Sequence, residues 1–375
     1  MRPNIRFHHL CEVAMTNMPP VSAGSAQTLD REEESPDVVR MSLAAAMTLD
    51  FAPGSFYRNA CLYCINLLLT YKSSCAGRCA YCGLSPKRES GKSFIRVSWP
   101  ALRLEDVAQA IVNKKERVKR ICISMLTNRR ALADTVSISR TLREAVDIPI
   151  SVLVAPTIVT REHLQAFKDA GVDKIGVAID MATPELFDRY RGRGVHGPHV
   201  WQRYWDCLAE SLEIFGRGMA GSHFMVGMGE TEQEMASAMQ RVRDMGGFTH
   251  LFSFFPEAGS LLADRPAPPL DQYRRIQLAR WIIDNDLGRA GQFDFAETGQ
   301  IRGYGLPDSL INEFLDNGSA FRTSGCTGRD GEVACNRPYA NWRPGPGTRN
   351  YPFAPDENDR RHIRLQLGLP QYARK

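Results

Sequence analysis

The chain has 375 residues, of which 43% are hydrophobic and 24% are charged, and its formal net charge is +5. This composition excludes a fibrous or wholly disordered protein and can supply one large α/β barrel with extensions. The basic residues are scattered rather than gathered with aromatic residues, so we expect no nucleic-acid partner. Ten cysteines are too sparse for a disulfide scaffold in a chain of this length and fit metal chemistry in a reducing compartment.

The sequence contains no apolar run of signal-peptide or membrane-spanning length, so we expect a cytoplasmic protein without a membrane partner. Residues 1–35 are rich in Pro, Ser, Gly and acidic side chains. Such a segment buries too little apolar surface to offset the entropy of ordering, which predicts a flexible N-terminal extension.

From residue 36 the pattern becomes periodic. Val38 to Leu49 predicts a short amphipathic helix, and six strand patterns then alternate with six helical patterns. The expected strands are Ile65–Tyr71, Ile121–Met125, Ile148–Val154, Lys174–Ile179, His223–Gly227 and His250–Phe254. The expected helices are Leu104–Arg117, Ala133–Val146, Arg161–Ala170, Trp201–Phe215, Glu232–Met245 and Asp271–Asp286.

This alternation predicts an α/β fold with a parallel sheet and right-handed crossovers. Six units are too few for a closed eight-unit barrel. We therefore expect a barrel domain over residues 36–290 and a C-terminal extension over residues 291–375. The extension has too little periodicity for a separate core and is expected to wrap over the open side of the barrel.

The most informative motif is Cys75-x3-Cys79-x2-Cys82, which follows the first predicted strand. Three thiolates on one short loop can bind three irons of a [4Fe–4S] cube and leave the fourth iron without a protein ligand. The alternative is a structural zinc site. Zinc sites usually pair two Cys-x2-Cys or Cys/His hooks, and no His partner lies near this loop.

This spacing, with the aromatic Tyr81 before the third cysteine, resembles the signature of the radical S-adenosylmethionine (SAM) enzymes. The resemblance implies that the open iron binds the amino and carboxylate groups of SAM. It also implies that the reduced cluster cleaves SAM to a 5′-deoxyadenosyl radical. The fold of that family is an open (β/α)6 partial TIM barrel, which the strand and helix pattern resembles over residues 64–290.

Two segments at predicted strand ends resemble parts of the SAM pocket of biotin synthase. Gly227-x-Gly229-Glu230 is similar to a glycine-rich segment that borders the adenosyl group, although a tight turn before a Thr231 helix cap would read the same way. Asp180 is similar to a carboxylate that binds the ribose hydroxyls. The alternative for Asp180 is a helix N-cap, since Thr183-Pro184-Glu185 follows it.

The methionyl end of SAM has weaker candidates. Many radical SAM enzymes carry Gly-Gly-Glu after the second strand, whereas this chain has Ser124-Met-Leu-Thr127, so we expect the Ser124 or Thr127 hydroxyl to receive the SAM amino group. Arg191 and Arg193 lie in a loop near the expected site and could bind a SAM or substrate carboxylate bidentately, or be solvated charges.

Four further cysteines could meet if the C-terminal extension returns over the barrel, and four thiolates suit a second [4Fe–4S] cluster. They are Cys61, Cys64, Cys326 and Cys335. A zinc ion, or a cluster that only transfers electrons or anchors substrate, is the alternative. Cys122 and Cys207 lie in a strand and a helix, respectively, and are expected to be small buried hydrophobes.

The segment Asn66-Leu-Leu-Leu-Thr-Tyr before the loop, and the late Thr323-Ser-Gly-Cys with Cys335-Asn-Arg-Pro-Tyr, resemble the two-component, archaeal-type lipoyl synthase proteins. This resemblance implies sulfur insertion into an octanoyl group on an acyl or lipoyl carrier protein, with the auxiliary cluster as sulfur source. It also implies a second radical SAM protein and a reductant such as ferredoxin or flavodoxin.

Two other hypotheses stay open at this point. One is a radical SAM rearrangement or C–C bond-forming enzyme, similar to methylornithine synthase, in which the second cysteine group is structural. The other is a non-enzymatic iron–sulfur assembly protein, which would form no 5′-deoxyadenosine from SAM.

Overall fold

The computed structural model describes residues 34–84, 96–337, 345 and 347–373. The predicted flexible extension therefore lies outside the described residues, apart from its last two. Eight strands form one sheet in the order β3-β1-β2-β4-β5-β6-β7-β8. Six of them run parallel and follow one another along the chain: β2 (Cys64–Leu69), β4 (Arg120–Ser124), β5 (Ile150–Val154), β6 (Val172–Asp180), β7 (Ala220–Val226) and β8 (Phe248–Ser253).

The sheet is an open barrel, because its end strands β3 and β8 do not pair with each other. Every residue of β2 is buried, as is typical of a parallel strand that is covered on both faces. The predicted (β/α)6 partial TIM barrel is confirmed.

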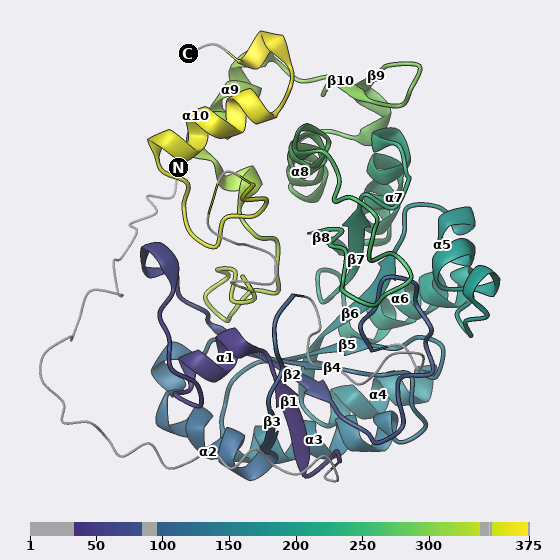
Figure 1. Ribbon diagram of the computed structural model, residues 1–375, viewed down its shortest axis with the longest axis vertical. Coiled ribbons are helices and arrows are strands. Elements are labelled where there is room, and N and C mark those ends of the chain that lie inside the picture. The colour runs from purple at the N-terminus through teal and green to yellow at the C-terminus, as the bar shows by residue number, and fades with distance from the viewer. Residues whose placement is uncertain (1–33, 85–95, 338–344, 346, 374–375) are drawn as a thin grey trace, which may run out of the picture.

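Helices follow the parallel strands and cover the outer face of the sheet (Figure 1). They are α2 (Leu104–Asn113), α3 (Ala131–Ala145), α4 (Arg161–Asp169), α5 (Pro184–Tyr190), α6 (Trp201–Phe215), α7 (Glu232–Met245) and α8 (Leu270–Asp284). In α7 the buried Met235, Met239 and Val242 recur at helical spacing, which is the apolar stripe expected of a helix packed on a sheet. Among the described residues, no helix is both long and apolar enough to cross a membrane.

The helix predicted over Val38–Leu49 is wrong in its first third. Val38–Met41 forms strand β1, which pairs antiparallel with β2 on one side and with β3 (Ala101–Arg103) on the other. β-branched Val38 and Val39 fit a buried pleated surface, and the free edge of β2 offers backbone partners that a helix would leave unpaired. A shorter helix, α1 (Leu43–Thr48), begins after Ser42, whose side chain caps it.

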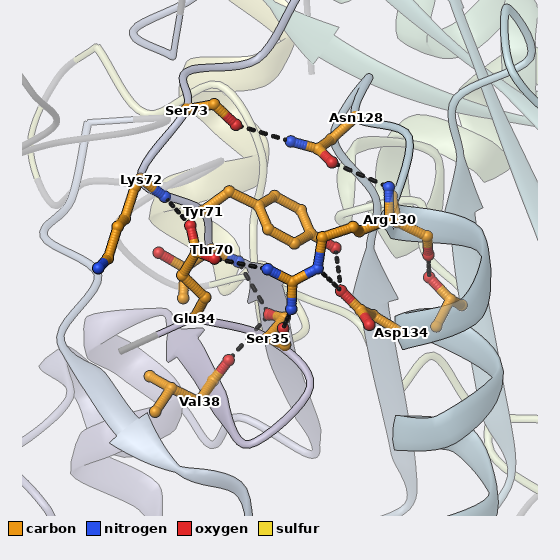
Figure 2. Close-up of polar contacts among 12 residues, drawn as sticks. Glu34, Ser35, Val38, Thr70, Tyr71, Lys72, Ser73, Asn128, Arg130 and Asp134 are labelled. Atoms are coloured by element: carbon orange, nitrogen blue, oxygen red, sulfur yellow. Dashed lines mark hydrogen bonds and ion pairs between the residues drawn. The ribbon is translucent and has the colours of Figure 1, made fainter. Parts of the chain in front are cut away.

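A group of polar contacts ties the start of β1 to the ends of β2 and β4 (Figure 2). Glu34 accepts a hydrogen bond from the Lys72 backbone and pairs with Arg130 at 2.5 Å. The Tyr71 hydroxyl donates to Asp134 at 2.8 Å. Because residues 70–73 lead directly into the cysteine loop, these contacts fix where that loop begins.

The C-terminal part contains more regular structure than its sequence predicts. It forms β9 (Asp294–Phe295), β10 (Ile301–Gly303), α9 (Asp308–Asn317) and α10 (Glu357–Gln366). Helix α10 packs against both α9 and α8 (Figure 1). Short 3-10 turns occupy Tyr57–Asn59, Lys115–Arg117, Arg193–Val195, Ala290–Gln292, Ser319–Phe321 and Pro370–Tyr372.

Candidate functional site

The three cysteines of the loop lie beyond the carboxyl end of β2, and backbone groups are directed at their sulfurs. The Cys75 sulfur accepts hydrogen bonds from the N–H groups of Gly77 and Thr127, both at 3.4 Å. The Cys82 sulfur accepts one from Leu84 at 3.4 Å. Hydrogen bonds of this kind favour the thiolate, which is the form that ligates iron.

Two backbone hydrogen bonds hold the loop on the barrel. The Ala76 N–H donates to the Thr127 carbonyl at 3.0 Å, and the Ala80 N–H donates to the Tyr190 carbonyl at 2.8 Å. Thr127 follows β4, and Tyr190 ends α5. Ser124, at the carboxyl end of β4, is buried like Thr127. The expected contacts of the Ser124 and Thr127 hydroxyls with the SAM amino group stay predictions.

The three thiols are close enough to influence one another. Burial raises the pKa of Cys79, and Arg191 acts in the opposite direction. Burial, followed by the neighbouring Cys79 and Cys75, raises the pKa of Cys82. Within the described part of the chain, no three His, Cys, Asp or Glu side chains meet closely enough to hold one metal ion. A cube does not require such convergence, because each cysteine binds a different iron.

Asp180 is tied to the cysteine loop. It ends β6 with a φ of 64°, in the left-handed region that non-glycine residues seldom adopt. Its carboxylate accepts a hydrogen bond from the hydroxyl of Tyr81, the residue before Cys82. The alternative role as a helix N-cap is wrong, because Thr183 caps α5 by accepting from the Leu186 N–H at 3.3 Å. The carboxylate therefore lies beside the loop, where a ribose next to the cluster would be in reach.

Arg191 is part of this site, but its guanidinium is already engaged. It lies 3.2 Å from the Asp180 carboxylate and donates to the Ile179 carbonyl and the Tyr204 hydroxyl, each at 3.1 Å. It also donates to the Ala178 carbonyl. Its Nε is buried and has no hydrogen-bond partner among the described residues. This arrangement holds the end of β6 in place, so a role as a clamp for a carboxylate would require Arg191 to exchange partners.

Arg193 lies outside this group of contacts, in the exposed position expected of the alternative, a solvated charge. Its side chain is 92% exposed and pairs with Asp188 at 3.1 Å. Asp188 also accepts from the Arg193 backbone N–H at 3.1 Å, so the pair closes the turn after α5. Arg191 and Arg193 are only two residues apart in the sequence, so the sequence suggests equivalent roles. In the structure Arg191 is buried and Arg193 is exposed.

His199 is a residue of the site that sequence reasoning missed. It is buried, and its Nδ1 lies 2.6 Å from the Thr157 hydroxyl and 2.9 Å from the Tyr204 hydroxyl. Burial, followed by the nearby Arg191, lowers the pKa of His199 to about 3, so the imidazole is neutral. A Cβ on Gly77 would lie 3.0 Å from the His199 Nε2, which explains glycine in the loop. No periodicity or motif in the sequence marks this histidine.

The glycine-rich segment after β7 adopts conformations that favour glycine. Gly227 and Gly229 have φ of 107° and 114°. The buried Glu230 carboxylate accepts from the N–H groups of Gly227 at 2.7 Å and Met228 at 2.8 Å. Glu230 thus holds the turn, and its expected contact with the cofactor stays a prediction. Thr231 caps α7, as the capping-box spacing predicts.

A second group of thiols forms inside the barrel, at the end opposite the cysteine loop. Asn66 of β2 is in register with Cys122 of β4, so Cys64, Asn66 and Cys122 share one face of the sheet. The Asn66 amide nitrogen lies 3.6 Å from the Cys64 sulfur and 3.5 Å from the Cys335 sulfur. Cys326 and Cys335 influence the titration of Cys122 electrostatically. The "inner thiol group" below means Cys64, Cys122, Cys326 and Cys335.

The inner thiol group is electrostatically coupled. Burial and the contact with Cys335 raise the pKa of Cys64. The hydrogen bond from Cys64 lowers the pKa of Cys335 to about 6. Burial and the neighbouring sulfurs raise the pKa of Cys122 to about 12.

Cys61 differs from the other cysteines of the expected auxiliary set, because it is disulfide-bonded whereas Cys64, Cys326 and Cys335 are free. The role of these four cysteines as auxiliary-cluster ligands stays a prediction. Cys122, expected to be a small buried hydrophobe, lies within electrostatic reach of Cys326 and Cys335. Cys207 is fully buried in α6, as predicted.

The fold and the loop together define a class of protein. Its members are open α/β barrels that carry three cysteines beyond the carboxyl end of the first parallel strand. Residues 70–242 match the family model described as the radical SAM superfamily. A biotin synthase from Polaromonas naphthalenivorans is 25% identical over 236 residues, 60% of this chain and 64% of the relative. Biotin synthase 2 from Polaromonas sp. is 23% identical over 221 residues, 58% of this chain and 61% of the relative. The chain thus matches less than two thirds of the length of both relatives.

These matches support a radical SAM, biotin-synthase-like assignment for the chain. Such a domain implies a [4Fe–4S] cluster with SAM. The loop fits this group because the sulfurs of Cys75 and Cys82 accept backbone hydrogen bonds and because Cys79 and Cys75 both lie within electrostatic reach of Cys82. The X-ray structure of the FeFe-hydrogenase maturase HydG from Carboxydothermus hydrogenoformans aligns with a TM-score of 0.48 and 15% identity, covering 65% of this chain and 56% of that one. Coproporphyrinogen III oxidase (HemN) from Escherichia coli aligns with a TM-score of 0.37 and 16% identity, covering 64% of this chain and 53% of that one.

Proposed function

We propose that this chain is a radical SAM enzyme that generates a 5′-deoxyadenosyl radical and uses it to insert sulfur at an unactivated C–H bond. The observation that carries the proposal is the attachment of Asp180 to the cysteine loop through Tyr81. A carboxylate can accept hydrogen bonds from both hydroxyls of a ribose. The proposed cluster ligands and the proposed ribose acceptor thus lie side by side.

Cys75, Cys79 and Cys82 would hold the cluster, which supplies the electron that cleaves SAM when it is bound. Asp180 would orient the ribose, and the turn at Gly227 and Gly229 lets backbone run beside the adenosyl group. The strands and helices around the site keep water away from the reacting carbon. Binding and orientation are the contributions of the protein, while the cofactor supplies the difficult chemistry.

The inner thiol group supports sulfur insertion as the outcome of the radical chemistry. Cys64 and Leu69 are the ends of β2, and five steps of about 3.3 Å separate them by roughly 16 Å. A substrate between the two ends could meet the adenosyl group on one side and a sulfur source on the other. The curated relatives are named as biotin synthases, which agrees with sulfur insertion.

The specific substrate proposed is an octanoyl group on an acyl or lipoyl carrier protein, which would make the chain lipoyl synthase-like. A second radical SAM protein would share the two sulfur insertions, and ferredoxin or flavodoxin would supply electrons. The support is the cysteine pattern of the C-terminal part, where Cys326 and Cys335 join the barrel cysteine Cys64.

The first experiment measures 5′-deoxyadenosine after anaerobic reconstitution with iron and sulfide, in the presence of dithionite and SAM. Wild-type protein is expected to form it, and Cys75→Ala is expected to form none. Absence of 5′-deoxyadenosine from fully loaded wild-type protein would refute the enzyme and leave the iron–sulfur assembly hypothesis.

The second experiment separates sulfur insertion from rearrangement. Octanoyl carrier protein is added, and thiolated product is measured by mass spectrometry together with the sulfide remaining in the protein. Sulfur insertion predicts sulfide loss that matches the sulfur gained by product, and no product from Cys326→Ala. A rearrangement enzyme would keep its sulfide and retain full activity in Cys326→Ala or Cys335→Ala.

A further inference from the structure

The inner face of the parallel sheet is more accessible than its outer face. Along β7, His223 and Met225 are partly exposed, whereas Phe224 and Val226 are buried. Successive strand residues point to opposite faces, so the two partly exposed side chains share one face. Helices cover the outer face, which leaves the accessible face inside the barrel (Figure 1). Side chains on the neighbouring strands are partly exposed as well, namely Cys122, Leu153, Ala178 and Phe252.

Arg337 lies inside the barrel. Its guanidinium carbon is 5.6 Å from the centroid of the Phe252 ring on β8. The same guanidinium acts electrostatically on Cys122 of β4, on His223 of β7 and on Cys335. These residues come from different sides of the barrel, so the side chain lies between them. Its φ of 39° is positive, which is unusual for a residue other than glycine and persists only where the surroundings hold it.

Arg337 is a buried cation that lacks a hydrogen-bond acceptor. It is 9% exposed, and among the residues that the structure describes its guanidinium donates no hydrogen bond and forms no ion pair. A guanidinium carries five donors, and an unpaired buried charge is costly. Other buried arginines of this protein do have oxygen acceptors: Arg120 at the Thr327 carbonyl, Arg191 at the Ile179 carbonyl and Arg275 at the Glu232 carboxylate. Arg337 therefore has room for an oxygen acceptor from a ligand.

Cys335 does not take the place of this acceptor. Its sulfur lies 3.5 Å from the Asn66 amide nitrogen and accepts a hydrogen bond from Cys64. No hydrogen bond joins it to Arg337 within the described part of the chain. Cys335 can offset part of the positive charge, but it leaves the guanidinium donors unfilled.

The strand register gives the level of Arg337 in the barrel. Asp180 pairs with Phe224, and Phe224 pairs with Leu251, the residue before Phe252. The Phe252 ring therefore lies within about one strand residue, roughly 3.3 Å, of the Asp180 level. Since Arg337 contacts this ring and also acts on Cys335, an acceptor bound to it would lie between the proposed ribose site and the inner thiol group.

The other inner-face groups around Arg337 are uncharged or apolar. The His223 ring centroid lies 4.9 Å from that of Phe252. Burial, followed by Arg337, lowers the pKa of His223 to about 3, so this imidazole is neutral. Leu153 and Met225 add aliphatic surface to the same face. An apolar surface with one placed cation suits an aliphatic chain that carries a single oxygen-bearing group.

We propose that the Arg337 guanidinium binds the acyl oxygen of a fatty-acyl substrate, which is the carbonyl of an acyl-lysine amide or the carboxylate of a free acid. This proposal rests on the proposed function and deepens it, because it names the substrate group that the barrel recognises. Arg337 is then a substrate-binding residue supplied by the C-terminal part of the chain.

The test measures binding by equilibrium dialysis, on full-length protein reconstituted with iron and sulfide and without reductant. The probes are a lysine peptide carrying an octanoyl group, octanoic acid, and a peptide with an alkyl side chain of equal length and no carbonyl. Wild-type protein is expected to bind one oxygen-bearing probe roughly 10- to 100-fold more tightly than the carbonyl-free peptide, and the tighter of the two identifies the source of the oxygen. Arg337→Gln is expected to lose this preference, and Arg337→Lys to regain part of it. Arg329→Gln is the matched control, because this exposed arginine lies in the same segment, and it should bind like wild type.

Iron content and far-UV circular dichroism distinguish a binding role from a structural one. Arg337→Gln should match wild type in both, and loss of iron would overturn the proposal by showing that Arg337 supports the cysteines. Equal affinity of Arg337→Gln and wild type for the oxygen-bearing probes would overturn it too, as would wild-type protein that binds neither of them. Dialysis needs no turnover, so this result is independent of the 5′-deoxyadenosine assay that tests the proposed function.

Discussion

At the scale of single residues, Asp180 shows how the fold positions a charged side chain beside the loop. Its left-handed backbone ends β6, the Tyr81 hydroxyl donates to its carboxylate, and Arg191 lies 3.2 Å away. A strained backbone of this kind persists only where its surroundings hold it. The carboxylate is therefore in place before SAM binds.

Asp180→Asn is expected to weaken SAM binding by roughly 10- to 100-fold, because hydrogen bonds to a charged group contribute about 1.5–3 kcal/mol. Equilibrium dialysis with SAM on the reconstituted protein measures this. Arg193→Ala is the matched control and should bind SAM like wild type, since Arg193 pairs only with the exposed Asp188. Equal affinity in Asp180→Asn and wild type would contradict ribose binding by Asp180.

At the scale of secondary-structure elements, one buried arginine joins strand β4 to residues 326–335, which fold back on themselves. Arg120 makes a bidentate pair with Asp173 at 2.6 and 2.8 Å and donates to the Thr327 carbonyl. An exposed pair, Arg329 with Asp147, also joins residues 326–335 to the barrel. The two pairs differ in burial, so they should differ in energetic weight.

Arg120→Gln is expected to destabilise the chain by about 2–4 kcal/mol, because Asp173 and the Thr327 carbonyl lose a charged donor. Differential scanning calorimetry should show a Tm lower by roughly 5 °C. Arg329→Gln should leave Tm unchanged, since water solvates both partners. Equal effects of the two substitutions would show that burial of Arg120 does not set its contribution.

Strand β7 carries a histidine, His223, that makes the stability of the chain depend on pH. Burial, followed by Arg337, lowers the pKa of His223 to about 3, below its ordinary value of 6.5. The unfolded chain therefore binds a proton at this residue between about pH 6.5 and 3 that the folded chain does not bind, so its contribution to stability is complete above pH 6.5 and is lost as the pH falls.

His223→Gln in the apo protein should consequently lose less stability than wild type between pH 7 and pH 4. The expected difference is at most about 3.4 kcal/mol, from about 2.5 pH units at 1.36 kcal/mol per unit. Urea unfolding at the two pH values measures it. Parallel decreases in wild type and His223→Gln would show that His223 is protonated in the folded chain.

At the scale of the whole molecule, the C-terminal part is joined to the barrel through two arginines of α8. The buried Arg274 donates to the Arg349 carbonyl at 2.6 Å and to the Gln366 side chain at 3.0 Å. Arg275 donates to the Leu367 carbonyl at 3.0 Å. The domain boundary expected near residue 290 stays a prediction, but the barrel's last helix relies on residues beyond it.

Deletion of residues 347–375 is expected to yield an insoluble or protease-sensitive chain, because Arg274 would be left buried without these acceptors. Soluble yield and limited proteolysis measure the effect. Deletion of residues 374–375 serves as the control and should leave both unchanged. A soluble, protease-resistant product of the longer deletion would show that the barrel folds independently of this segment.

Local sequence determined the parts of this protein that depend on neighbours in the chain. The strand and helix periodicity predicted the six parallel strands, and the spacing of Cys75, Cys79 and Cys82 predicted the cluster loop, because a loop brings such residues together wherever it lies. The sequence alone also placed Asp180 and Gly227 at strand ends, where a parallel barrel gathers its site.

Only the tertiary structure decided what depends on contacts between distant segments. Val38–Met41 became a strand because the free edge of β2 was available, and the Glu230 carboxylate accepts hydrogen bonds from the backbone of its own loop. Cys122 joined the inner thiol group because strand register placed it on the same face as Asn66 and because residues 326–335 returned to meet it. Register and chain return are set by packing over the whole sheet, so no local pattern in the sequence records them.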